Sequence, residues 1–303
     1  MRIAVTGATG YVGGRLVPRL LERGHELRVI VRATQDVEMR RWHRDVEVRV
    51  ADLLDEAATR QALAGADAAY YLVHSFRTAR YDEKDLQLAE NFARAARPLS
   101  RLVYLGSLLP EWRRAPRLES RARVGAILRR DRPALELRAG PIVGSGSILF
   151  EMVRSITEET AVMIAPAWID RPVQPIAIRD VLSILVEGIE SDVNGVVEIG
   201  ADPITFRSMM ETYAELRDLR RAIIAIPFSF PRLSALWIGA VTPLSGRLVL
   251  PTIEALHRGV RADLRRAADC FPDVRPMDFQ TAVELALRKV HKNAIETRWS
   301  DAP

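Results

Sequence analysis

The stretch Thr6-Gly7-Ala8-Thr9-Gly10-Tyr11-Val12-Gly13, close to the start of the chain, decides the fold. A short apolar run of β type, Arg2–Thr6, leads into it, and apolar residues at helical spacing follow from Val12 to Leu21. Leu27–Val31 then reads as a second buried strand. The order of strand, glycine turn, helix and strand is typical of one βαβ unit.

The three glycines of this turn stand where a bound dinucleotide requires them. Gly7 permits the tight turn, Gly10 lets the backbone approach a pyrophosphate, and Gly13 lets the helix pack closely on the strand. The helix N-terminus offers free N–H groups and a positive dipole end to the phosphates. A glycine-rich turn without a ligand is the alternative, and the flanking strand and helix favour binding. We therefore expect the cofactor to contact the turn residues Gly7, Thr9, Gly10, Tyr11, Val12 and Gly13.

The residue that ends the second strand indicates which dinucleotide binds. A site selective for NAD usually has Asp or Glu there, which holds the ribose 2′-hydroxyl. This chain has Arg32, and a guanidinium suits a 2′-phosphate by its charge and its fork of donors. Arg28 either adds positive charge nearby or is a solvated residue at the strand edge. The sequence thus predicts NADP(H) rather than NAD(H).

Strands and helices continue to alternate over the first half of the chain. Further β runs are expected at Val46–Val50, Ala68–Val73, Arg101–Leu105 and Leu135–Leu137. This alternation predicts an α/β fold with a Rossmann-type doubly wound parallel sheet. The pattern becomes irregular after residue 145. We expect a dinucleotide-binding core over residues 1–145 and a smaller, mainly helical lobe over 146–303, of which about 173–200 re-enters the core.

The composition excludes several classes of protein. Of 303 residues, 48% are hydrophobic and 27% charged, which is typical of a soluble globular protein. The single cysteine, Cys270, leaves no internal disulfide or cysteine metal cluster and fits a reducing cytoplasm, and no metal site is expected. The net charge of +5 is spread over scattered arginines without interleaved aromatic residues, so no nucleic-acid partner is expected. No signal peptide is expected, and the apolar stretch Leu233–Gly246 is too short to span a bilayer.

The carboxyl ends of parallel strands meet at the ligand crevice, which directs attention to the residues that follow each strand. Asp52 and Leu53 follow the third strand, and Asp52 either reaches an adenine amino group or caps the helix that starts near Asp55. His74 ends the fourth strand and either exchanges a proton or merely lines the pocket. Ser107 follows the fifth strand and either orients a substrate or caps a turn.

These segments resemble the short-chain dehydrogenase/reductase superfamily in its extended and atypical branches. Residues 6–13 match its T-G-A-T-G-x-x-G turn, and Arg138–Gly144 is similar to an R-x-G-x-I-x-G segment whose Pro and Ile face the nicotinamide. The subgroup looks NmrA-like, similar to the bacterial YbjT-type NAD(P)H-binding proteins, on features such as residues 71–75 and 296–301. The resemblance implies a cofactor site that also includes Leu72, Val73, Pro141 and Ile142.

The proton relay of that superfamily is missing from this chain. Its reductases use a Tyr with a Lys four residues later, and a Ser after the fifth strand orients the substrate carbonyl. Ser107 stands at the Ser position, whereas Arg117 and Arg121 fall at the Tyr and Lys positions. Arginine can hold a ribose hydroxyl but stays protonated, so it is a poor general acid. The resemblance implies that Arg121 binds the nicotinamide ribose and leaves Ser107, His74 and Arg121 as candidate catalytic residues.

Two tyrosines are further candidate proton donors, provided that their side chains are not buried in the core. Tyr71 and Tyr104 lie within apolar strands, where core packing is the usual role. A hydrophobic substrate pocket is indicated by apolar residues of the second half, although these too are usually core residues: Met209, Met210, Phe228, Phe230 and Trp237. Trp299 is expected to hold the C-terminal tail on the body.

We therefore expect an NADP(H)-dependent oxidoreductase acting on a hydrophobic small molecule. A quinone-like acceptor suits a site without the Tyr, since solvent can supply the proton. The alternative is a non-catalytic NADP(H)-binding sensor or scaffold, which the missing relay favours. A third and weaker hypothesis is that Pro227–Pro251 contacts a membrane surface. Interfacial helices normally carry a basic face, whereas the only charged residues of this segment are Arg232 and Arg247.

Overall fold

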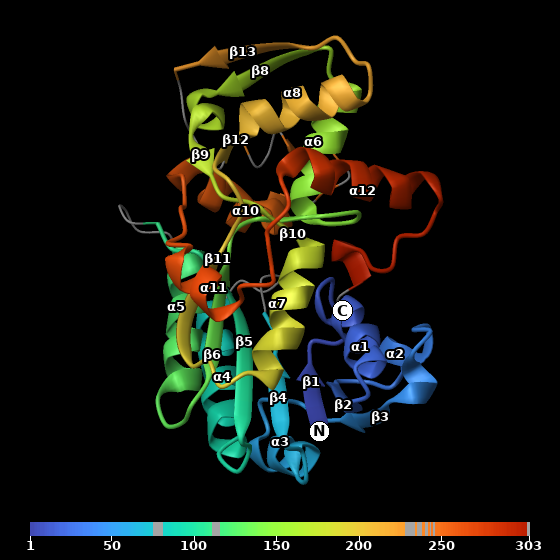
Figure 1. Ribbon diagram of the computed structural model, residues 1–303, viewed down its shortest axis with the longest axis vertical. Coiled ribbons are helices and arrows are strands. Elements are labelled where there is room, and N and C mark those ends of the chain that lie inside the picture. The colour runs from blue at the N-terminus through green and yellow to red at the C-terminus, as the bar shows by residue number, and fades with distance from the viewer. Residues whose placement is uncertain are drawn as a thin grey trace.

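The computed structural model describes residues 1–74, 81–110, 116–227, 234, 238–239, 242, 244 and 246–301 (Figure 1). Among these, the side chains of residues 81, 116–117, 246–248 and 299 lie outside the description, including those of Arg117 and Trp299. An α/β body contains the N-terminal half, and a lobe built from the second half of the chain stands on one end of it (Figure 1).

A seven-stranded parallel sheet forms the centre of the body, in the order β11-β6-β5-β4-β1-β2-β3. Its strands are β1 (Arg2–Thr6), β2 (Glu26–Val31), β3 (Glu47–Val50), β4 (Ala68–Tyr71), β5 (Arg101–Ser107), β6 (Leu135–Ala139) and β11 (Gly195–Ile199). The order changes direction between β1 and β4, where doubly wound sheets open a crevice for ligands. The predicted Rossmann-type α/β fold is confirmed.

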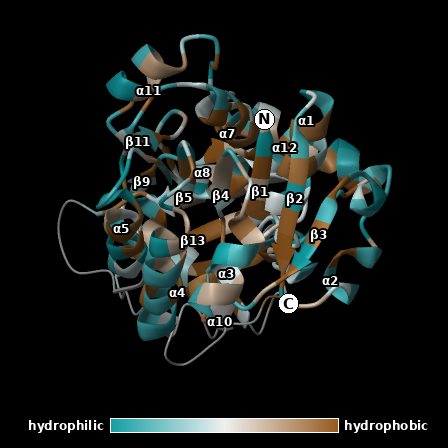
Figure 2. Cartoon of the chain, turned by 90° about the horizontal axis from the view of Figure 1, so that it is seen from below, coloured by the Kyte–Doolittle hydropathy of each residue, from teal (hydrophilic) through white to brown (hydrophobic). Residues whose placement is uncertain are grey.

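Helices cover both faces of this sheet. They are α1 (Gly13–Glu22), α2 (Gln35–Glu38), α3 (Glu56–Leu63), α4 (Tyr81–Ala95), α5 (Pro116–Arg129) and α7 (Ile178–Glu190), with α11 (Arg265–Cys270) beside β11 and a short η1 (His43–Asp45) before β3. The apolar stripes of α1 and α7 bury one face of the sheet, and those of α3, α4 and α5 bury the other. Central strands buried on both sides need continuous apolar runs, which Figure 2 shows as brown β1 and β2.

The ends of several elements differ from the sequence prediction. β4 ends at Tyr71, not at Val73, because the N–H of Leu72 turns to the Thr6 Oγ1 at 3.3 Å instead of continuing the ladder. β6 extends to Ala139, two residues beyond the predicted run Leu135–Leu137. The earlier end of β4 releases Leu72, Val73 and His74 from the sheet and leaves them at its edge.

The lobe is mainly helical but also contains small sheets that the periodicity did not reveal. Its helices are α6 (Ile148–Glu159), α8 (Phe206–Leu216), α10 (Gly246–Arg258) and α12 (Phe279–His291), with η2 (Ala167–Asp170) and η3 (Trp299–Asp301). Three two-stranded sheets pair β7 (Ile142–Val143) with β10 (Ile176–Ala177), β9 (Pro172–Val173) with β12 (Ile204–Thr205), and β8 (Val162–Pro166) with β13 (Ala222–Ile226). Strands of two to five residues are too short to show a clear alternation. Met209 and Met210 are buried in the lobe core, not in a pocket.

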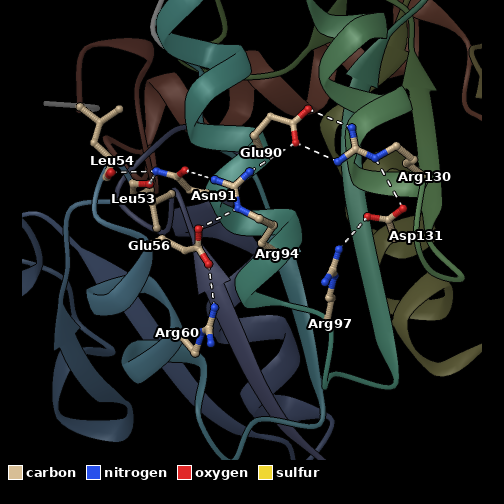
Figure 3. A network of polar contacts seen from close by, with 10 residues as sticks. All are labelled: Leu53, Leu54, Glu56, Arg60, Glu90, Asn91, Arg94, Arg97, Arg130 and Asp131. Atoms are coloured by element: carbon tan, nitrogen blue, oxygen red, sulfur yellow. Dashed lines mark hydrogen bonds and ion pairs between the residues drawn. The ribbon is translucent and has the colours of Figure 1, made fainter.

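Polar contacts fix the loop after β3 to the helix that covers it (Figure 3). The Asn91 side chain of α4 donates to the carbonyl oxygens of Leu53 at 3.0 Å and Leu54 at 2.7 Å. Arg94 in turn donates to the Asn91 Oδ1 and to Glu56 at the start of α3, both at 2.7 Å. The segment that contains Asp52 and Leu53 is thereby held in a defined position.

Candidate functional site

A cleft of about 550 Å³ lies at the carboxyl ends of β1, β2, β4 and β5. It brings together most of the residues that the sequence indicates for cofactor binding or catalysis, with the exception of Arg28, Tyr71 and Tyr104. They are Gly7, Thr9, Gly10, Tyr11, Val12, Gly13, Arg32, Asp52, Leu53, Leu72, Val73, His74, Ser107, Arg121, Pro141 and Ile142. The carboxyl ends of parallel strands converge at one edge, and this convergence collects residues from the ends of six strands, β1 to β6.

The glycine turn has room for a ligand but none for side chains at two positions. Gly7 has φ +72°, and a Cβ there would lie 2.5 Å from the Leu72 carbonyl oxygen. A Cβ on Gly13 would lie 2.2 Å from the Gly7 oxygen, so strand and helix meet backbone to backbone. The first turn of α1 contains no acidic residue, which leaves the positive end of its dipole open to an anion.

The strand order changes direction between β1 and β4, and the end of the cleft away from that point is lined by Arg32, Asp52 and Asp36. Arg32 is exposed and follows β2 directly. Asp52 does not cap a helix, because α3 is capped by Asp55, whose Oδ1 accepts from the Ala58 N–H at 3.0 Å. Asp52 instead accepts from the Leu54 N–H at 3.0 Å in a local turn and faces the cleft. Of the two readings of Asp52, the helix cap is wrong.

Both readings of Arg28 are also wrong. Its side chain is 5% exposed and lies away from the cleft. It donates to Glu47 Oε2 at 2.7 Å and to the carbonyl oxygens of Ala62 and Ala64 at 2.9 and 2.6 Å. The two carbonyl oxygens lie at the end of α3 and Glu47 lies on β3, so the buried guanidinium joins the helix to the sheet.

Ser107, Arg121 and His74 meet at the other end of the cleft. An Nη1 hydrogen of Arg121 is donated to the Ser107 Oγ, and the Tyr104 hydroxyl donates to the Arg121 carbonyl oxygen at 3.1 Å. The His74 ring lies 6.1 Å from the Tyr104 ring, edge to face. Burial and the Arg121 charge hold the pKa of His74 well below its usual value, although a hydrogen bond to the Leu105 backbone opposes them. His74 is therefore neutral near pH 7, takes up a proton only reluctantly and has no imidazolium proton to release.

The two strand tyrosines belong to the core. Tyr71 and Tyr104 are each 1% exposed and pack together with Phe92 under α4. Burial raises the pKa of both phenols well above the usual value. Neither side chain lines the cleft, so neither reaches a substrate bound there.

The cleft also contains residues that the sequence did not indicate, the polar Asp36, Lys84, Ser147 and Thr252 and the apolar residues of α10. Lys84 lies in the first turn of α4 and Asp36 in the first turn of α2, and both line the cleft. Residues of α10, among them Pro251 and Ala255, close the cleft from the lobe side. Lys84 and Asp36 lie inside helices, where a polar residue is normally a solvated one, so the sequence carries no signal for them.

The C-terminal residues 296–301, called here the C-terminal strap, are bound to the back of the glycine turn. The Thr297 hydroxyl donates to the Tyr11 carbonyl oxygen and accepts from Arg15 Nε, both at 2.8 Å. Arg15, buried beside the Tyr11 ring, also donates to the carbonyl oxygens of Thr297 and Ser145 at 3.0 and 2.7 Å. Arg40 joins the Thr9 carbonyl oxygen to Asp301. The strap thus positions the backbone that would face the cofactor phosphates.

Replacing Thr297 by Val should loosen this turn. The change leaves a buried carbonyl and a buried guanidinium each without one partner, which we expect to lower the free energy of unfolding by about 1–3 kcal/mol. Affinity for the dinucleotide should fall several-fold in a calorimetric titration of the same protein. Thr297→Ser keeps the hydroxyl and should retain most of both quantities. Equal losses in the two variants would contradict a role for the hydroxyl.

The depressed pKa of His74 predicts a loss of stability in acid. As the pH falls below about 6.5, His74 of the unfolded chain binds a proton, whereas His74 of the folded protein stays neutral. Each further pH unit then costs up to about 1.4 kcal/mol of unfolding free energy until the folded imidazole is protonated as well. Urea unfolding between pH 7.5 and 5.5 should show a steeper loss for the parent protein than for His74→Gln. Parallel pH profiles would show that His74 titrates normally.

A second and larger hollow of about 720 Å³ lies between α1, α7 and α12. Its walls are the apolar sides of α7 and α12 and a charged rim that includes Arg19, Arg179 and Arg288. None of the proposed cofactor or catalytic residues lines it. Size alone therefore does not mark the site of chemistry in this protein.

A family model matches the part of the chain that contains the glycine turn of the cleft. Residues 7–136 match the model of a family described as NAD(P)H-binding. The match covers 130 of the 303 residues and is a similarity of this part of the chain to that family. The match begins at Gly7 and ends in β6, so it covers the glycine turn and the strands β2 to β5 of the sheet.

Solved structures with the same fold span almost the whole chain. A nucleoside-diphosphate-sugar epimerase from Staphylococcus aureus superposes with a TM-score of 0.75 at 17% identity, covering 94% of this chain and 100% of that one. Citrobacter sp. triphenylmethane reductase gives 0.75 at 18% identity over 95% and 100%. Bordetella bronchiseptica WbmG in complex with NAD gives 0.74 at 16% identity over 99% and 96%. The expected likeness to atypical short-chain dehydrogenase/reductases is confirmed at the level of fold.

Curated relatives match over a short segment. The uncharacterized proteins Rv2047c of Mycobacterium tuberculosis and Mb2073c of Mycobacterium bovis are each 43% identical over 67 residues. That segment is 22% of this chain and 7% of either relative. Within the described residues, no helix has the length and apolar character to cross a membrane, and no group of side chains forms a metal site.

Proposed function

We propose that the protein is an NADP(H)-dependent oxidoreductase of the atypical, NmrA-like type, acting on a hydrophobic small molecule. One observation carries this proposal: a single cleft joins a glycine turn without space for side chains to a polar group of Ser107, Arg121 and His74. The glycine turn suits a pyrophosphate, and the group of Ser107, Arg121 and His74 suits the oxygen of a reacting substrate.

The cofactor's phosphates and ribose find matching groups along the cleft. The Gly7–Gly13 backbone and the start of α1 suit the pyrophosphate. Arg32 supplies the charge for a 2′-phosphate, and Asp52 lies beside it for the adenine amino group. Asp36 is a carboxylate in the same part of the cleft and favours a 2′-hydroxyl, so the balance between Arg32 and Asp36 sets the preference for NADP(H) over NAD(H).

The substrate end of the cleft is apolar apart from its catalytic corner. Its walls come from α4, α5, α6 and α10, with side chains that include Leu88, Leu118, Leu149, Pro251 and Ala255. Burial of an apolar ligand against such walls supplies most of its affinity. A hydrophobic molecule with one reducible oxygen fits this distribution.

NADPH bound in the cleft would supply a hydride, and the protein's own residues would orient the acceptor. The Ser107 oxygen accepts a hydrogen bond from Arg121. The Ser107 hydroxyl can therefore donate its own hydrogen bond to a substrate oxygen. The Arg121 charge stabilises negative charge developing on that oxygen. The final proton comes from Lys84, an ammonium in the same cleft, or from water, because neutral His74 does not release one.

A non-catalytic NADP(H) sensor is the second candidate, favoured by the absence of Tyr-x-x-x-Lys from the sequence. One experiment separates the two. The protein is titrated calorimetrically with NADPH and NADH, and quinone and enone acceptors are then added while the nicotinamide absorbance is followed. NADPH binding with acceptor-dependent oxidation establishes the oxidoreductase. Loss of oxidation in Ser107→Ala with NADPH binding retained would place the reaction beside Ser107, Arg121 and His74. Binding without oxidation supports the sensor, and failure to bind either cofactor overturns both.

A further inference from the structure

The hollow between α1, α7 and α12 is separate from the cofactor cleft, and we call it the α7–α12 hollow. It lies where α12 of the lobe stands above α1 of the body (Figure 1). Its volume of about 720 Å³ is within the range of small-molecule sites, which is roughly 300–1,000 Å³. No described residue lines both spaces, and β7 lies between them, with Ile142 lining the cleft and Val143 the hollow. A ligand in the hollow would therefore leave the cofactor cleft open.

Apolar side chains form the floor of the α7–α12 hollow. Ile178, Leu182 and Val186 recur at every fourth position of α7, so they form one stripe along that helix. Leu285 and Ala286 line the floor from α12. All five are buried or partly buried. Water between such walls has few hydrogen-bond partners, and a hydrocarbon group that displaces it gains the free energy of apolar burial.

The rim of the hollow is positively charged. Seven arginine and lysine side chains line the hollow, against three glutamates. Arg179 lies in the first turn of α7, Arg288 lies in the last turn of α12, and Lys292 follows that helix directly, all three at exposed positions. Within the part of the chain that the structure describes, none of these three side chains has a hydrogen bond or an ion pair. Their charges are available to an anion.

The glutamates of the hollow do not neutralise those three cations. Glu296 is already paired with Arg19 and Lys289, at 3.0 and 3.3 Å. Burial raises the pKa of Glu187, so its carboxyl keeps a proton more readily than usual. Glu22 lies at the end of α1, at an exposed position. The field at the rim therefore favours a negatively charged group.

We propose that the α7–α12 hollow binds an amphiphilic anion, a hydrocarbon chain with one carboxylate or phosphate head group. The chain lies on the apolar floor, and the head group accepts charge-assisted hydrogen bonds from Arg179, Arg288 and Lys292. An inorganic anion makes no use of the floor, and an uncharged hydrocarbon makes no use of the rim. An amphiphile uses both, and the segregation of the two surfaces within one hollow carries this proposal.

The test is calorimetric titration of the full chain with octanoate, decanoate and laurate, below the concentrations at which they form micelles, with and without NADPH. Affinity should rise by up to about fourfold for each CH₂ that the floor buries. It should also fall as salt is added, because the rim is exposed. Dodecylammonium has the chain of laurate with the opposite charge, and inorganic phosphate has no chain. Both should bind at least about tenfold more weakly than laurate. Dodecyl phosphate tests the alternative head group.

Variants of the floor and the rim place the ligand in the hollow. Arg288→Gln combined with Lys292→Gln should weaken laurate binding by about tenfold or more, because two charge-assisted contacts are lost. Ser183→Phe puts a ring into the hollow from an exposed position of α7 and should weaken laurate more than octanoate, since the longer chain needs more of the floor. Arg41→Gln combined with Arg44→Gln removes the same charge from exposed positions outside the hollow and should bind laurate like the parent.

Laurate binding that the hollow variants lose and the control variant keeps supports the proposal. Tighter binding of dodecyl phosphate than of laurate also supports it and identifies the head group as phosphate. Equal affinity for laurate and dodecylammonium would overturn it, because the charge of the rim would then select nothing. So would an affinity that does not change with chain length. Unchanged laurate affinity in both hollow variants would place the ligand elsewhere, including the cofactor cleft. Circular dichroism and thermal unfolding of each variant exclude misfolding as the cause of lost binding.

Discussion

Gly7→Ala is expected to abolish measurable binding of NADPH, a loss of affinity of at least about 100-fold. Positive φ alone costs an L-residue about 1–2 kcal/mol, and Gly7 has φ +72°. The new Cβ would also lie 2.5 Å from the Leu72 oxygen, a backbone atom that cannot rotate away. The turn or the end of β4 must shift, and both line the cofactor cleft.

The chain offers a matched control for this change in Gly24, at the end of α1. Gly24 has φ +78°, and a Cβ there meets no atom within 4 Å. Gly24→Ala should therefore lower the melting temperature through backbone strain alone and leave NADPH affinity unchanged. Thermal unfolding and calorimetry of both variants separate strain from the steric clash. If Gly7→Ala bound NADPH as well as Gly24→Ala does, the turn would not hold the pyrophosphate.

Arg32→Glu is expected to reverse the cofactor preference. The substitution replaces a charge-assisted donor by a carboxylate that repels a 2′-phosphate, so NADPH affinity should fall on the order of 100-fold. The same carboxylate accepts from a ribose 2′-hydroxyl, so NADH affinity should stay the same or rise. Titration of both cofactors at low and high salt gives the comparison, with the larger salt effect on NADPH in the parent protein.

Arg41→Glu makes the same change in net charge at an exposed position outside the cleft. It should leave the ratio of the two affinities as it is in the parent protein. An unchanged NADPH affinity in Arg32→Glu would mean that Arg32 does not contact the phosphate. Asp36 would then be the dominant group and NAD(H) the cofactor.

The sequence by itself determined the parts of this protein whose physical causes are local. The glycine turn could be recognised because tight turning and close approach demand glycine at fixed spacing between a strand and a helix. The strand-end rule then placed Arg32, Asp52, His74 and Ser107 together, since parallel strands end at one edge whatever their order. The same reasoning failed for Arg28, because only the packing of α3 decides which face of β2 it meets.

Tertiary structure decided everything that depends on residues distant in the chain. Thr297 binds the turn from 286 residues away, and no local pattern signals such a partner. Lys84 and Asp36 line the cleft although each lies inside a helix and not at a strand end. The exposure of Ile164 and Ile224 follows from the pairing of two short strands on the rim of the lobe, where no other described element covers them. Sequence periodicity shows which residues are apolar, but only packing shows which of them remain in water.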